Sequence, residues 1–519
     1  MSRAVLGIDL GTTNSVVASI DDNGRPAVLR NAAGAETTPS VVYFEPDGTA
    51  VVGEYARQAV AADPANGVAL VKRQMGTDFP LEIRGERHTP ESISALILRQ
   101  LVAGAGAPDA RVVITVPAYF GLREREATHQ AGVLARLDVL ELVAEPVAAA
   151  VHYGLTAERD ATVLVYDLGG GTFDTTVLRV HSAGIDVVAT DGHHELGGAD
   201  VDRRLLRTVL DRLRDLLSPG EFADVCDDEV LLGTLLLDVE AAKRDLSARR
   251  SRDVPVRALG RRLTVSLTRE DVDGACTDLL ETTEDIVRRV LRTAGASGYS
   301  RIDQVVMVGG SSRIPAVLDR LRQATGVTPR LVEPDLAVAK GAALRAHQLA
   351  RTTQLRALAG SGRRAGLLAG GRIRSVVPRG IGILVQDSVD PDGRAFVDHV
   401  VKANTPLPVT EVADRFGTIV DGQETVRIRV YEQAGPTASE DVADNRLVLD
   451  GELTGVPPRT AGTVIRVTIT LGSDGRLTVV AHEPGSGREL TLEAFIEGVI
   501  DAADAERLAA LVGRTPVRE

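Results

Sequence analysis

Two short glycine-rich segments constrain this chain more than any other feature. The first hairpin is Gly7-Ile8-Asp9-Leu10-Gly11-Thr12-Thr13-Asn14-Ser15, and the second hairpin is Asp167-Leu168-Gly169-Gly170-Gly171-Thr172-Phe173-Asp174. In each, an apolar strand leads to an aspartate, then to glycines and hydroxyl side chains, and then to another apolar strand. Glycines let backbone N–H groups approach a phosphate closely, and the hydroxyls add donors. The aspartates suit Mg²⁺, which keeps much of its hydration shell.

Neither hairpin is specific by itself, because a glycine turn after a strand is usually only a turn. Neither contains the Gly-x-x-x-x-Gly-Lys-Ser/Thr pattern or runs directly into a helix, so a P-loop is not expected. Their repetition is more informative, since it suggests two similar half-domains that face each other across a nucleotide. A third segment fits the same cleft: an apolar run over 305–308 ends in a glycine turn at Gly309, Gly310 and Ser311.

These three segments resemble those of the actin-like ATPase superfamily, and most closely those of the seventy-kilodalton heat-shock chaperone family, heat shock protein 70 (Hsp70). The resemblance implies an α/β actin-like domain, with a duplicated ribonuclease-H-like fold, over residues 1–350. It also implies a flexible linker over 351–375, an all-β sandwich over 376–492 and a short C-terminal helical tail over 493–519. The match is specific in the first domain and patchy in the sandwich.

The resemblance also implies roles for individual residues around ATP or ADP. Slow ATP hydrolysis is the expected reaction, because phosphoryl transfer needs mainly positioning and charge neutralisation. The residues expected to hold Mg²⁺ and its waters are Asp9, Asp167 and Asp174. Those expected to bind phosphates are Gly11, Thr12, Thr13, Asn14, Gly169, Gly170, Gly171 and Thr172. The expected catalytic residues are Lys72, Glu145, Asp167 and Thr172.

Lysine is scarce in this chain. Of the 59 Lys and Arg residues only four are lysines, at positions 72, 243, 340 and 402. A lysine retained in such a chain suggests a need for a compact point charge that arginine does not supply. Lys72 lies in a segment that matches the family, which favours a place beside the γ-phosphate over a surface loop. The alternative for Glu145, which precedes Pro146, is a helix cap.

A third group of residues is expected to bind the adenosine. Glu240, Lys243, Arg244 and Ser247 recur at the spacing of one helix face. By spacing alone, a solvated stripe of ion pairs is the simpler interpretation. The resemblance instead implies that the stems of Lys243 and Arg244 sandwich the adenine. The residues expected to close the opposite side are Gly309, Gly310, Ser311, Arg313 and Asp335.

The last third of the chain alternates apolar and polar residues, as antiparallel strands do. Examples are 426–430, 465–471 and 477–481. The segment resembles the family's peptide-binding sandwich, which implies that it engages client polypeptide. A docking domain without a peptide cleft is the open alternative, because a β-sandwich by itself implies no ligand.

Three departures from the family pattern affect the expected coupling between domains. The linker is basic and glycine-rich rather than acidic and leucine-rich. After about Arg488 only a short helix over 502–511 is expected, so no long helical lid is expected and peptide release should be fast. Glu141 occupies a place where the family usually has arginine, near the surface that meets J-domain cochaperones. A nucleotide exchange factor is the other expected cochaperone.

Composition limits the remaining function classes. The net charge of −13 argues against general affinity for nucleic acid or acidic membranes. Cys226 and Cys276 form no metal or redox spacing, and no apolar run is long enough to span a membrane, so a cytoplasmic location is expected. The favoured function is therefore an ATP-dependent chaperone. The rivals are a nucleotide-dependent scaffold or regulator and a small-molecule kinase, for which the sequence shows no acceptor pocket.

Overall fold

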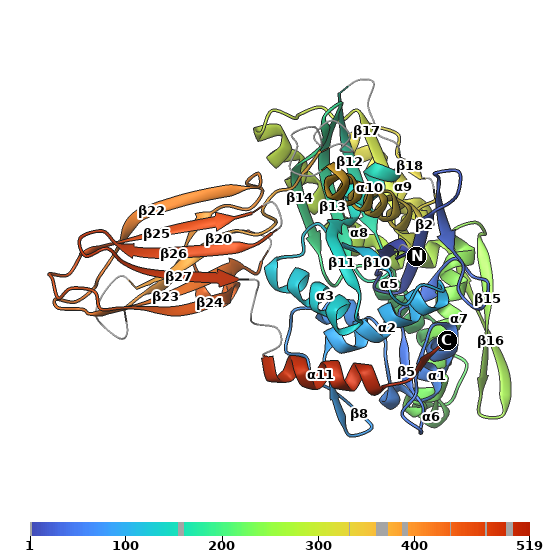
Figure 1. Cartoon of the computed structure of the whole chain (residues 1–519). Coiled ribbons are helices and arrows are strands. Elements are labelled where there is room, and N and C mark those ends of the chain that lie inside the picture. Colours follow the sequence, from blue (N-terminus) through green and yellow to red (C-terminus); the bar gives the residue numbers. More distant parts are fainter. Residues whose placement is uncertain are drawn as a thin grey trace.

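The computed structural model describes residues 3–153, 160–331, 333–359, 372–386, 393–435, 437–472, 475–494 and 502–519. Figure 1 shows a large α/β domain, from which a β-sandwich projects to one side. The sandwich is made of strands far along the chain, whereas helix α11 (Ala502–Arg514) and the strand after it lie back on the α/β domain.

The first half of the α/β domain is built on a sheet whose strand order is β11-β10-β1-β2-β3. The first hairpin joins β1 to β2, which pair in antiparallel fashion, and β10 pairs with β1 in parallel. These strands are β1 (Val5–Asp9), β2 (Asn14–Ile20), β3 (Pro26–Leu29), β10 (Arg111–Val116) and β11 (Asp138–Ala144). A short strand, β4 (Thr38–Pro39), pairs with β2 beside this path.

The second half repeats this arrangement. Its sheet has the order β18-β17-β12-β13-β14-β19, in which the second hairpin joins antiparallel β12 and β13 while β17 runs parallel to β12. The strands are β12 (Ala161–Leu168), β13 (Phe173–His181), β14 (Gly184–His193), β17 (Gln304–Val308), β18 (Arg330–Leu331) and β19 (Arg372–Arg374). The shared order confirms the predicted duplication, and each glycine hairpin occupies the equivalent position in its own sheet.

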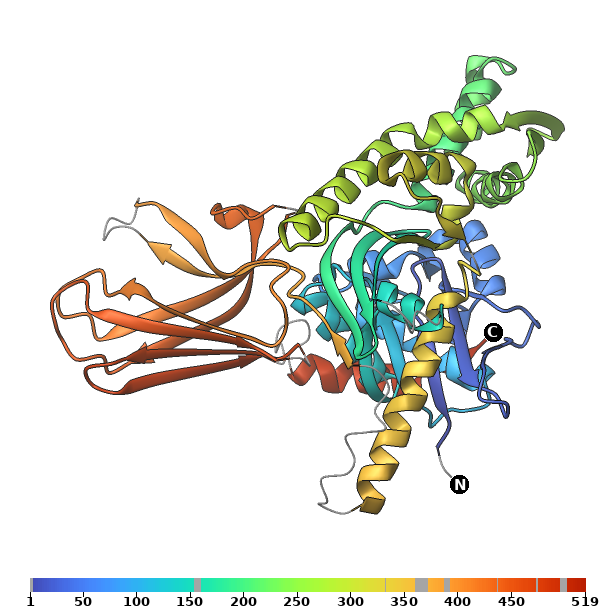
Figure 2. The same ribbon diagram turned by 90° about the horizontal axis from the view of Figure 1, so that it is seen from above.

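Two alanine-rich helices, α4 (Glu145–His152) and α10 (Ala337–Ala359), pack together with residues of both sheets in one core. Small side chains allow this close packing. A Cβ at Gly7 of β1 would lie 2.0 Å from the backbone nitrogen of Ala343, and one at Gly341 would lie 1.7 Å from the carbonyl oxygen of Ala148. Figure 2 shows α10 crossing the domain and extending beyond it.

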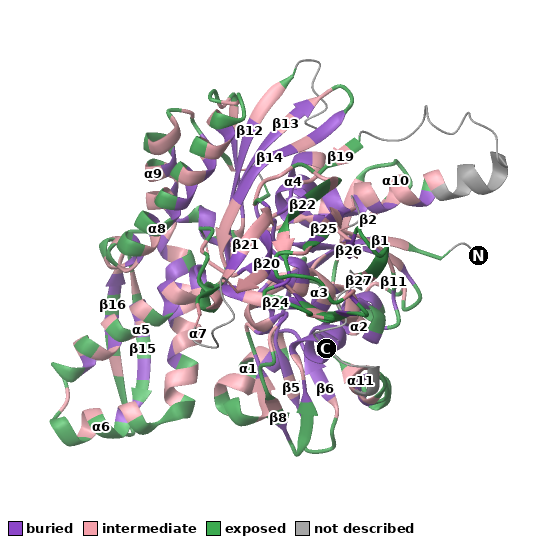
Figure 3. Cartoon of the chain, turned by 90° about the vertical axis from the view of Figure 1, so that its left-hand side faces the viewer, coloured by how far each residue is buried: buried purple, intermediate pink, exposed green. Residues whose placement is uncertain are grey.

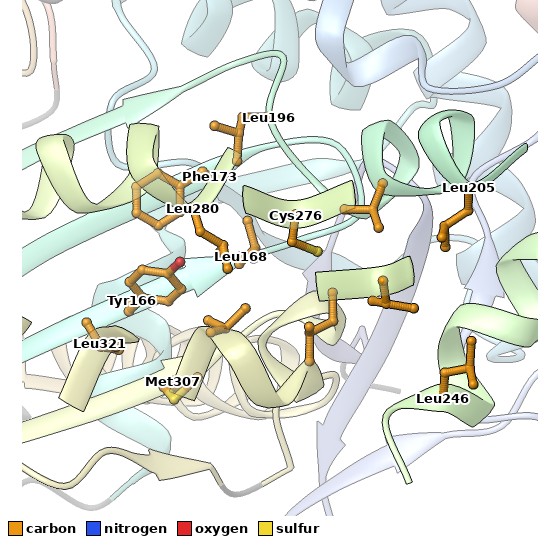
Figure 4. Close-up of a cluster of buried hydrophobic side chains, with 14 of the residues drawn as sticks. Tyr166, Leu168, Phe173, Leu196, Leu205, Leu246, Cys276, Leu280, Met307 and Leu321 are labelled. Atoms are coloured by element: carbon orange, nitrogen blue, oxygen red, sulfur yellow. The ribbon is translucent and has the colours of Figure 1, made fainter. Parts of the chain in front are cut away.

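Some of the remaining helices pack against the two sheets, and others pack against one another farther out. Strands β12, β13 and β14 are mostly buried in Figure 3, and their core includes Tyr166, Phe173, Leu280 and Met307, drawn in Figure 4. The helices of the second half are α5 (Gly198–Arg214), α6 (Pro219–Asp227), α7 (Glu229–Leu246), α8 (Arg269–Ala296) and α9 (Pro315–Thr325), with a hairpin of β15 (Ser251–Ala258) and β16 (Arg261–Thr268). Those of the first half are α1 (Glu54–Ala62), α2 (Pro90–Gly104) and α3 (Leu122–Leu134).

The β-sandwich consists of two four-stranded antiparallel sheets, ordered β21-β20-β23-β24 and β22-β25-β26-β27. Alternate residues point inward, so that Ile465, Val467 and Ile469 are buried while Val464 and Arg466 are exposed. The strands are β20 (Ile381–Gln386), β21 (Ala395–Val401), β22 (Val409–Gly417), β23 (Thr425–Gln433), β24 (Asn445–Thr454), β25 (Val464–Leu471), β26 (Leu477–Glu483) and β27 (Arg488–Ala494). The sandwich confirms the predicted second fold class.

The connection between the two parts differs from the predicted linker over 351–375. Helix α10 continues to Ala359, and β19 pairs in parallel with β14 of the α/β domain. Regular backbone hydrogen bonding therefore occupies both ends of that segment, while residues 360–371 lie outside the described residues. The composition of the segment gave no sign of these pairings, because β19 becomes a strand only through its contact with distant residues.

A buried group of charged residues joins the sandwich to α3. Glu124 of α3 forms ion pairs with Arg446 (2.8 Å) and Arg379 (3.7 Å). Glu432 of β23 is 1% exposed, and its carboxylate accepts the N–H of Leu122 at 2.9 Å. Burial and the neighbouring Glu124 carboxylate raise the pKa of Glu432 from 4.5 to about 7. A proton on Glu432 therefore reduces the repulsion between the Glu432 and Glu124 carboxylates at this interface near neutral pH.

We predict that Glu432→Gln reduces the pH dependence of stability. The folded protein holds a proton on Glu432 between pH 4.5 and 7 that the unfolded chain releases, so the free energy of unfolding falls as pH rises through that window. Urea unfolding at pH 5 and pH 8 should show that glutamine, neutral throughout, removes up to about 2 kcal/mol of this loss. Glu411→Gln, at an exposed carboxylate on β22, is the control. Equal pH dependence in Glu432→Gln and the unmodified protein would contradict the assignment.

Candidate nucleotide site

The two glycine hairpins touch each other across the cleft between the halves. A Cβ at Gly170 would lie 2.2 Å from the Oγ1 atom of Thr13, and one at Gly171 would lie 2.2 Å from the Cγ2 atom of Thr12. Only glycine therefore lets the second hairpin approach the first this closely. The contact places backbone N–H groups and hydroxyls of both hairpins around one space, as a phosphate chain requires.

A cavity of about 630 Å³ lies between the halves, within the usual size range for a small-molecule site. It brings together nearly all the site residues that the sequence predicts. Those that line it are Asp9, Gly11, Thr12, Thr13, Asn14, Lys72, Glu145, Asp167, Gly169, Gly170, Thr172, Glu240, Lys243, Arg244, Ser247, Gly309, Gly310, Ser311, Arg313 and Asp335. Gly171 and Asp174 are the predicted residues that do not line it.

Lys72 and Glu145 form a buried ion pair at the floor of this cavity. The Nζ atom of Lys72 lies 2.7 Å from Oε1 of Glu145, and both side chains are less than a tenth exposed. Lys72 belongs to a short 3-10 helix, Val71–Gln74, and Glu145 begins α4. Glu145 is thus in the first turn of a helix, as the capping alternative had it, and it also faces the cavity. The two interpretations are compatible.

The aspartates of the site lie in a strongly acidic, buried environment. Burial and the Glu145 carboxylate raise the pKa of Asp9 to about 7, although Lys72 opposes this. The same two causes raise the pKa of Asp167 well above its ordinary value. Burial raises the pKa of Asp174 to about 8 even though it accepts the N–H of Ala118. The Lys72 ammonium lowers the pKa of all three aspartates but does not outweigh the effect of their burial.

The carboxylates fit Mg²⁺ held through its waters better than a directly ligated ion. In the described part of the chain, no three His, Cys, Asp or Glu side chains come together as a metal-binding group. Asp9 and Asp167 face the cavity, and the buried Oδ1 atom of Asp174 has no hydrogen-bond partner. Mg²⁺ usually retains several waters, which extend the reach of a carboxylate. The donor set therefore suits a hydrated magnesium ion.

The predicted helix face lies on α7 and forms one wall of the cavity. The face is solvated in part, since Arg244 is exposed and forms an ion pair with Glu240 of the same helix. Lys243, by contrast, is buried, and its Nζ atom contacts the Asp202 carboxylate at 2.8 Å and the carbonyl of Gly198 at 2.9 Å. Glu240 pairs with Arg57 of α1 at 3.1 Å, and so links the two halves above the cavity. The Lys243 ammonium thus pairs with the Asp202 carboxylate, and the stem of the same side chain lines the cavity.

Sequence reasoning missed the residues that come from distant elements. Asp202 and Arg57 were not predicted, although Asp202 lies about one turn into α5, the first helix after the second hairpin. Arg73 was missed as well: it donates to the carbonyl of Gly171 at 2.8 Å and pairs with Asp200 at 2.6 Å. The position of Arg73 next to Lys72 was the one available hint. Its partners depend on how the halves close, which local sequence does not reveal.

The third predicted segment closes the other side of the cavity. The Oγ atom of Ser311 donates to the carbonyl of Gly169 at 2.8 Å, which ties this turn to the second hairpin. Arg313 pairs with Asp335 at 2.6 Å. The positive φ of Gly309 (82°) lets the chain turn beside Asp167, where a Cβ would lie 2.5 Å from the carboxylate.

Comparison with known proteins now adds to this geometry. The family model described as "Hsp70 protein" matches residues 5–512. A chaperone protein DnaK from Thermotoga neapolitana is 36% identical over 518 residues, covering 97% of this chain and 82% of the relative. One from Thermotoga petrophila is 37% identical over 502 residues, covering 94% and 80%. The chain belongs to the Hsp70 family. It is accordingly an ATP-dependent chaperone with ATPase activity.

Membership of the Hsp70 family draws attention to the charge at Glu141. Glu141, where the family usually has arginine, forms a two-point ion pair with Arg345 of α10 at 2.7 and 3.1 Å. Its reversed charge is therefore balanced within the chain.

Among the described residues, no helix is both long and apolar enough to cross a bilayer.

We predict that Gly170→Ala weakens nucleotide binding about tenfold or more, a loss of roughly 1.4 kcal/mol. The added methyl group would collide with the Cβ atom of Thr13, so rotating the threonine does not relieve the contact. Isothermal titration with ADP measures the effect. Gly104→Ala, where nothing lies within 4 Å, is the matched control and should bind as the unmodified protein does. Unchanged affinity in Gly170→Ala would show that the hairpins need not touch.

Proposed function

We propose that the residues of the cavity hydrolyse Mg²⁺-bound ATP and that the nucleotide state controls the binding of an extended client polypeptide at the far end of the β-sandwich. The observation that carries the proposal is the cavity itself, where three segments far apart in sequence converge on one space. Buried carboxylates, Lys72 and the two glycine hairpins make up its floor.

Each residue group has a distinct task in this proposal. Mg²⁺, when bound with ATP, neutralises charge on the phosphates. Asp9 and Asp167 hold its waters, while hydroxyls and amides of the two hairpins hold the phosphates. Lys72 and Glu145 orient the attacking water next to the γ-phosphate, since their ion pair fixes both side chains in the cavity. The stems of Lys243 and Arg244 contact the adenine.

We predict that Lys72→Ala lowers kcat for ATP hydrolysis about 100-fold or more and leaves ADP affinity nearly unchanged. The reason is that the lysine acts on the γ-phosphate and water, not on the adenosine. Steady-state phosphate release and titration with ADP separate the two effects. Lys402→Ala, at an exposed lysine of the second domain, is the matched control. Full turnover in Lys72→Ala would remove the catalytic role.

The end of the sandwich that faces away from the α/β domain carries exposed apolar side chains. Asn404 marks the near end, because its side chain accepts the N–H of Thr190 in β14 at 2.9 Å. Strand β22 begins shortly after this residue, so its other end, and the turn over 418–424 that follows, lie far from the α/β domain. Ile419 and Val420 in that turn are 36% and 39% exposed. Such residues suit an extended apolar segment.

A chain of contacts joins the nucleotide site to the sandwich. Asp174 ends the second hairpin and accepts the N–H of Ala118, just before α3. Four residues later, the N–H of Leu122 contacts Glu432 of the sandwich. A shift of the second hairpin on ATP binding therefore moves the segment on which the sandwich rests, even though the linker lacks the usual family sequence.

The proposal also includes the binding partners of this protein and its location in the cell. Client polypeptide, a J-domain cochaperone and a nucleotide exchange factor are the partners that the family implies, and the ion pair of Glu141 leaves a J-domain surface of altered charge. A cytoplasmic location remains a prediction of the sequence. The rival function, a scaffold that docks a folded partner without general peptide binding, is tested by the same experiment as client binding.

We predict that a fluorescent, extended apolar peptide binds with ADP and is released faster with ATP, as measured by anisotropy. Ile419→Asp combined with Val420→Asp should weaken binding about tenfold or more, because each aspartate places a charge in the apolar contact. Val412→Asp, at a residue 55% exposed on the outer face of β22, is the matched control. No peptide binding by the unmodified protein, with ATP hydrolysis intact, would favour the scaffold instead.

A further inference from the structure

The segment over 502–519, here called the return segment, is an integral part of the α/β domain although it follows the sandwich in the chain. Leu508, Leu511 and Val512 of α11 (Ala502–Arg514) are 0%, 5% and 1% exposed. They belong to the hydrophobic core of the first half, together with residues of β1 and α2. Figure 1 shows α11 lying beside α2 and α3.

Polar contacts fix both ends of the return segment. Arg99 of α2 donates to the carbonyls of Val512 and Thr515, and so satisfies groups that the end of a helix leaves unpaired. Arg507 donates to the carbonyl of Arg87 at 2.9 Å, and Arg514 pairs with Glu86 at 2.6 Å. The return segment is thus held by side-chain hydrogen bonds to backbone carbonyls, as well as by apolar packing.

A strand then extends the attachment. β28 (Val517–Arg518) pairs in parallel with β6 (Ala50–Val52), in a small sheet that also contains β5 (Val42–Phe44) and β7 (Gly67–Val68). The carbonyl of Pro516 accepts the N–H of Ala50 at 2.9 Å, and the Glu519 side chain accepts the N–H of Ala32 at 2.8 Å. Strand pairing, core packing and charged contacts all hold the same 18 residues.

This attachment limits where the sandwich can go. Seven residues, 495–501, join β27 to α11, so Ala494 stays within about 28 Å of Ala502 however the chain runs. The other covalent connection is the six residues 375–380, between β19, which belongs to the α/β domain, and β20 of the sandwich, and it spans at most about 25 Å. The sandwich is therefore held to the α/β domain by two short covalent connections, one at each end of its own chain segment.

We propose that the return segment keeps the β-sandwich docked on the α/β domain in every nucleotide state, so that ATP changes client binding within a docked assembly rather than by releasing the sandwich. Attachment by a core helix does not reverse without unfolding part of the first half. The contacts of Glu124 and Glu432 with their partners are then adjusted by nucleotide rather than broken.

The first test measures the distance between the two domains. Val412→Cys in the sandwich and Tyr55→Cys on α1 are both more than half exposed and accept fluorescent labels. Cys226→Ser removes the partly exposed native thiol, while Cys276 is buried. Energy transfer between the labels should be the same with ADP and with ATP. A separation that grows by about 10 Å or more with ADP in this intact chain would overturn the proposal.

The second test lengthens the connection between β27 and the return segment by inserting twenty Gly/Ser residues between Ala494 and Ala502. Such a linker spans roughly 25 Å on average, so the labelled domains should now separate when ADP is bound. The matched control places the same insertion in the exposed turn at Asn23 and Gly24, and it should behave as the unmodified protein does. A lengthened chain that remains as compact as the control would show that the return segment does not hold the sandwich.

The third test asks whether the return segment stays attached by itself. A protease recognition sequence replaces residues 495–501, and the labelled protein is cut and then passed over a sizing column. The 502–519 fragment should elute with the rest of the protein in ADP and in ATP. Elution as a free peptide in either nucleotide would overturn the proposal, because a dissociating segment cannot restrain the sandwich.

Discussion

The direct contact between the two glycine hairpins is the constraint on which the nucleotide site depends. Each hairpin ends a strand at the equivalent position of one of two similar sheets, so the duplication by itself places them face to face. Gly170 then lies so close to Thr13 that no side chain fits between them. A phosphate chain bound here must contact both halves at once. Nucleotide affinity and the angle between the halves are therefore linked, because the bound phosphates contact both halves.

Charge is the second constraint, and it extends from the nucleotide to the sandwich. The cavity gathers buried carboxylates around the ion pair of Lys72 and Glu145, and burial raises the pKa of Asp167 among them. Asp174 lies at the edge of this group and contacts Ala118, whose segment leads to the carboxylate of Glu432. The same short stretch of backbone thus meets an acidic residue of the nucleotide site and one of the sandwich. This arrangement explains how one domain can respond to the other across a packed interface.

The glycine hairpins pointed to a nucleotide between two similar halves, and the family resemblance that they carry made the fold class and most of the cavity lining predictable. A glycine turn after a strand, a lysine in an arginine-rich chain and a helical face ending at Ser247 are all visible in short windows. Contacts between elements far apart in sequence were not predictable, as Arg57 and Asp202 show, because each pairs with a residue from another element. The helix of the return segment was predicted over 502–511, whereas the strands β19 and β28 were missed for the same reason: their conformation depends on pairing with distant strands. The residue roles within the cavity remain predictions.

The central claim is that both hairpins form one nucleotide site, and amide hydrogen exchange tests it most directly. Exchange of the segments 10–15 and 168–174 is measured without nucleotide, with ADP and Mg²⁺, and with ADP alone. The account predicts that nucleotide slows exchange in both segments together and that Mg²⁺ deepens the effect. The exposed turn at 22–24 serves as an internal reference and should not change. Slowed exchange in one hairpin only, with the other unaffected, would contradict the account.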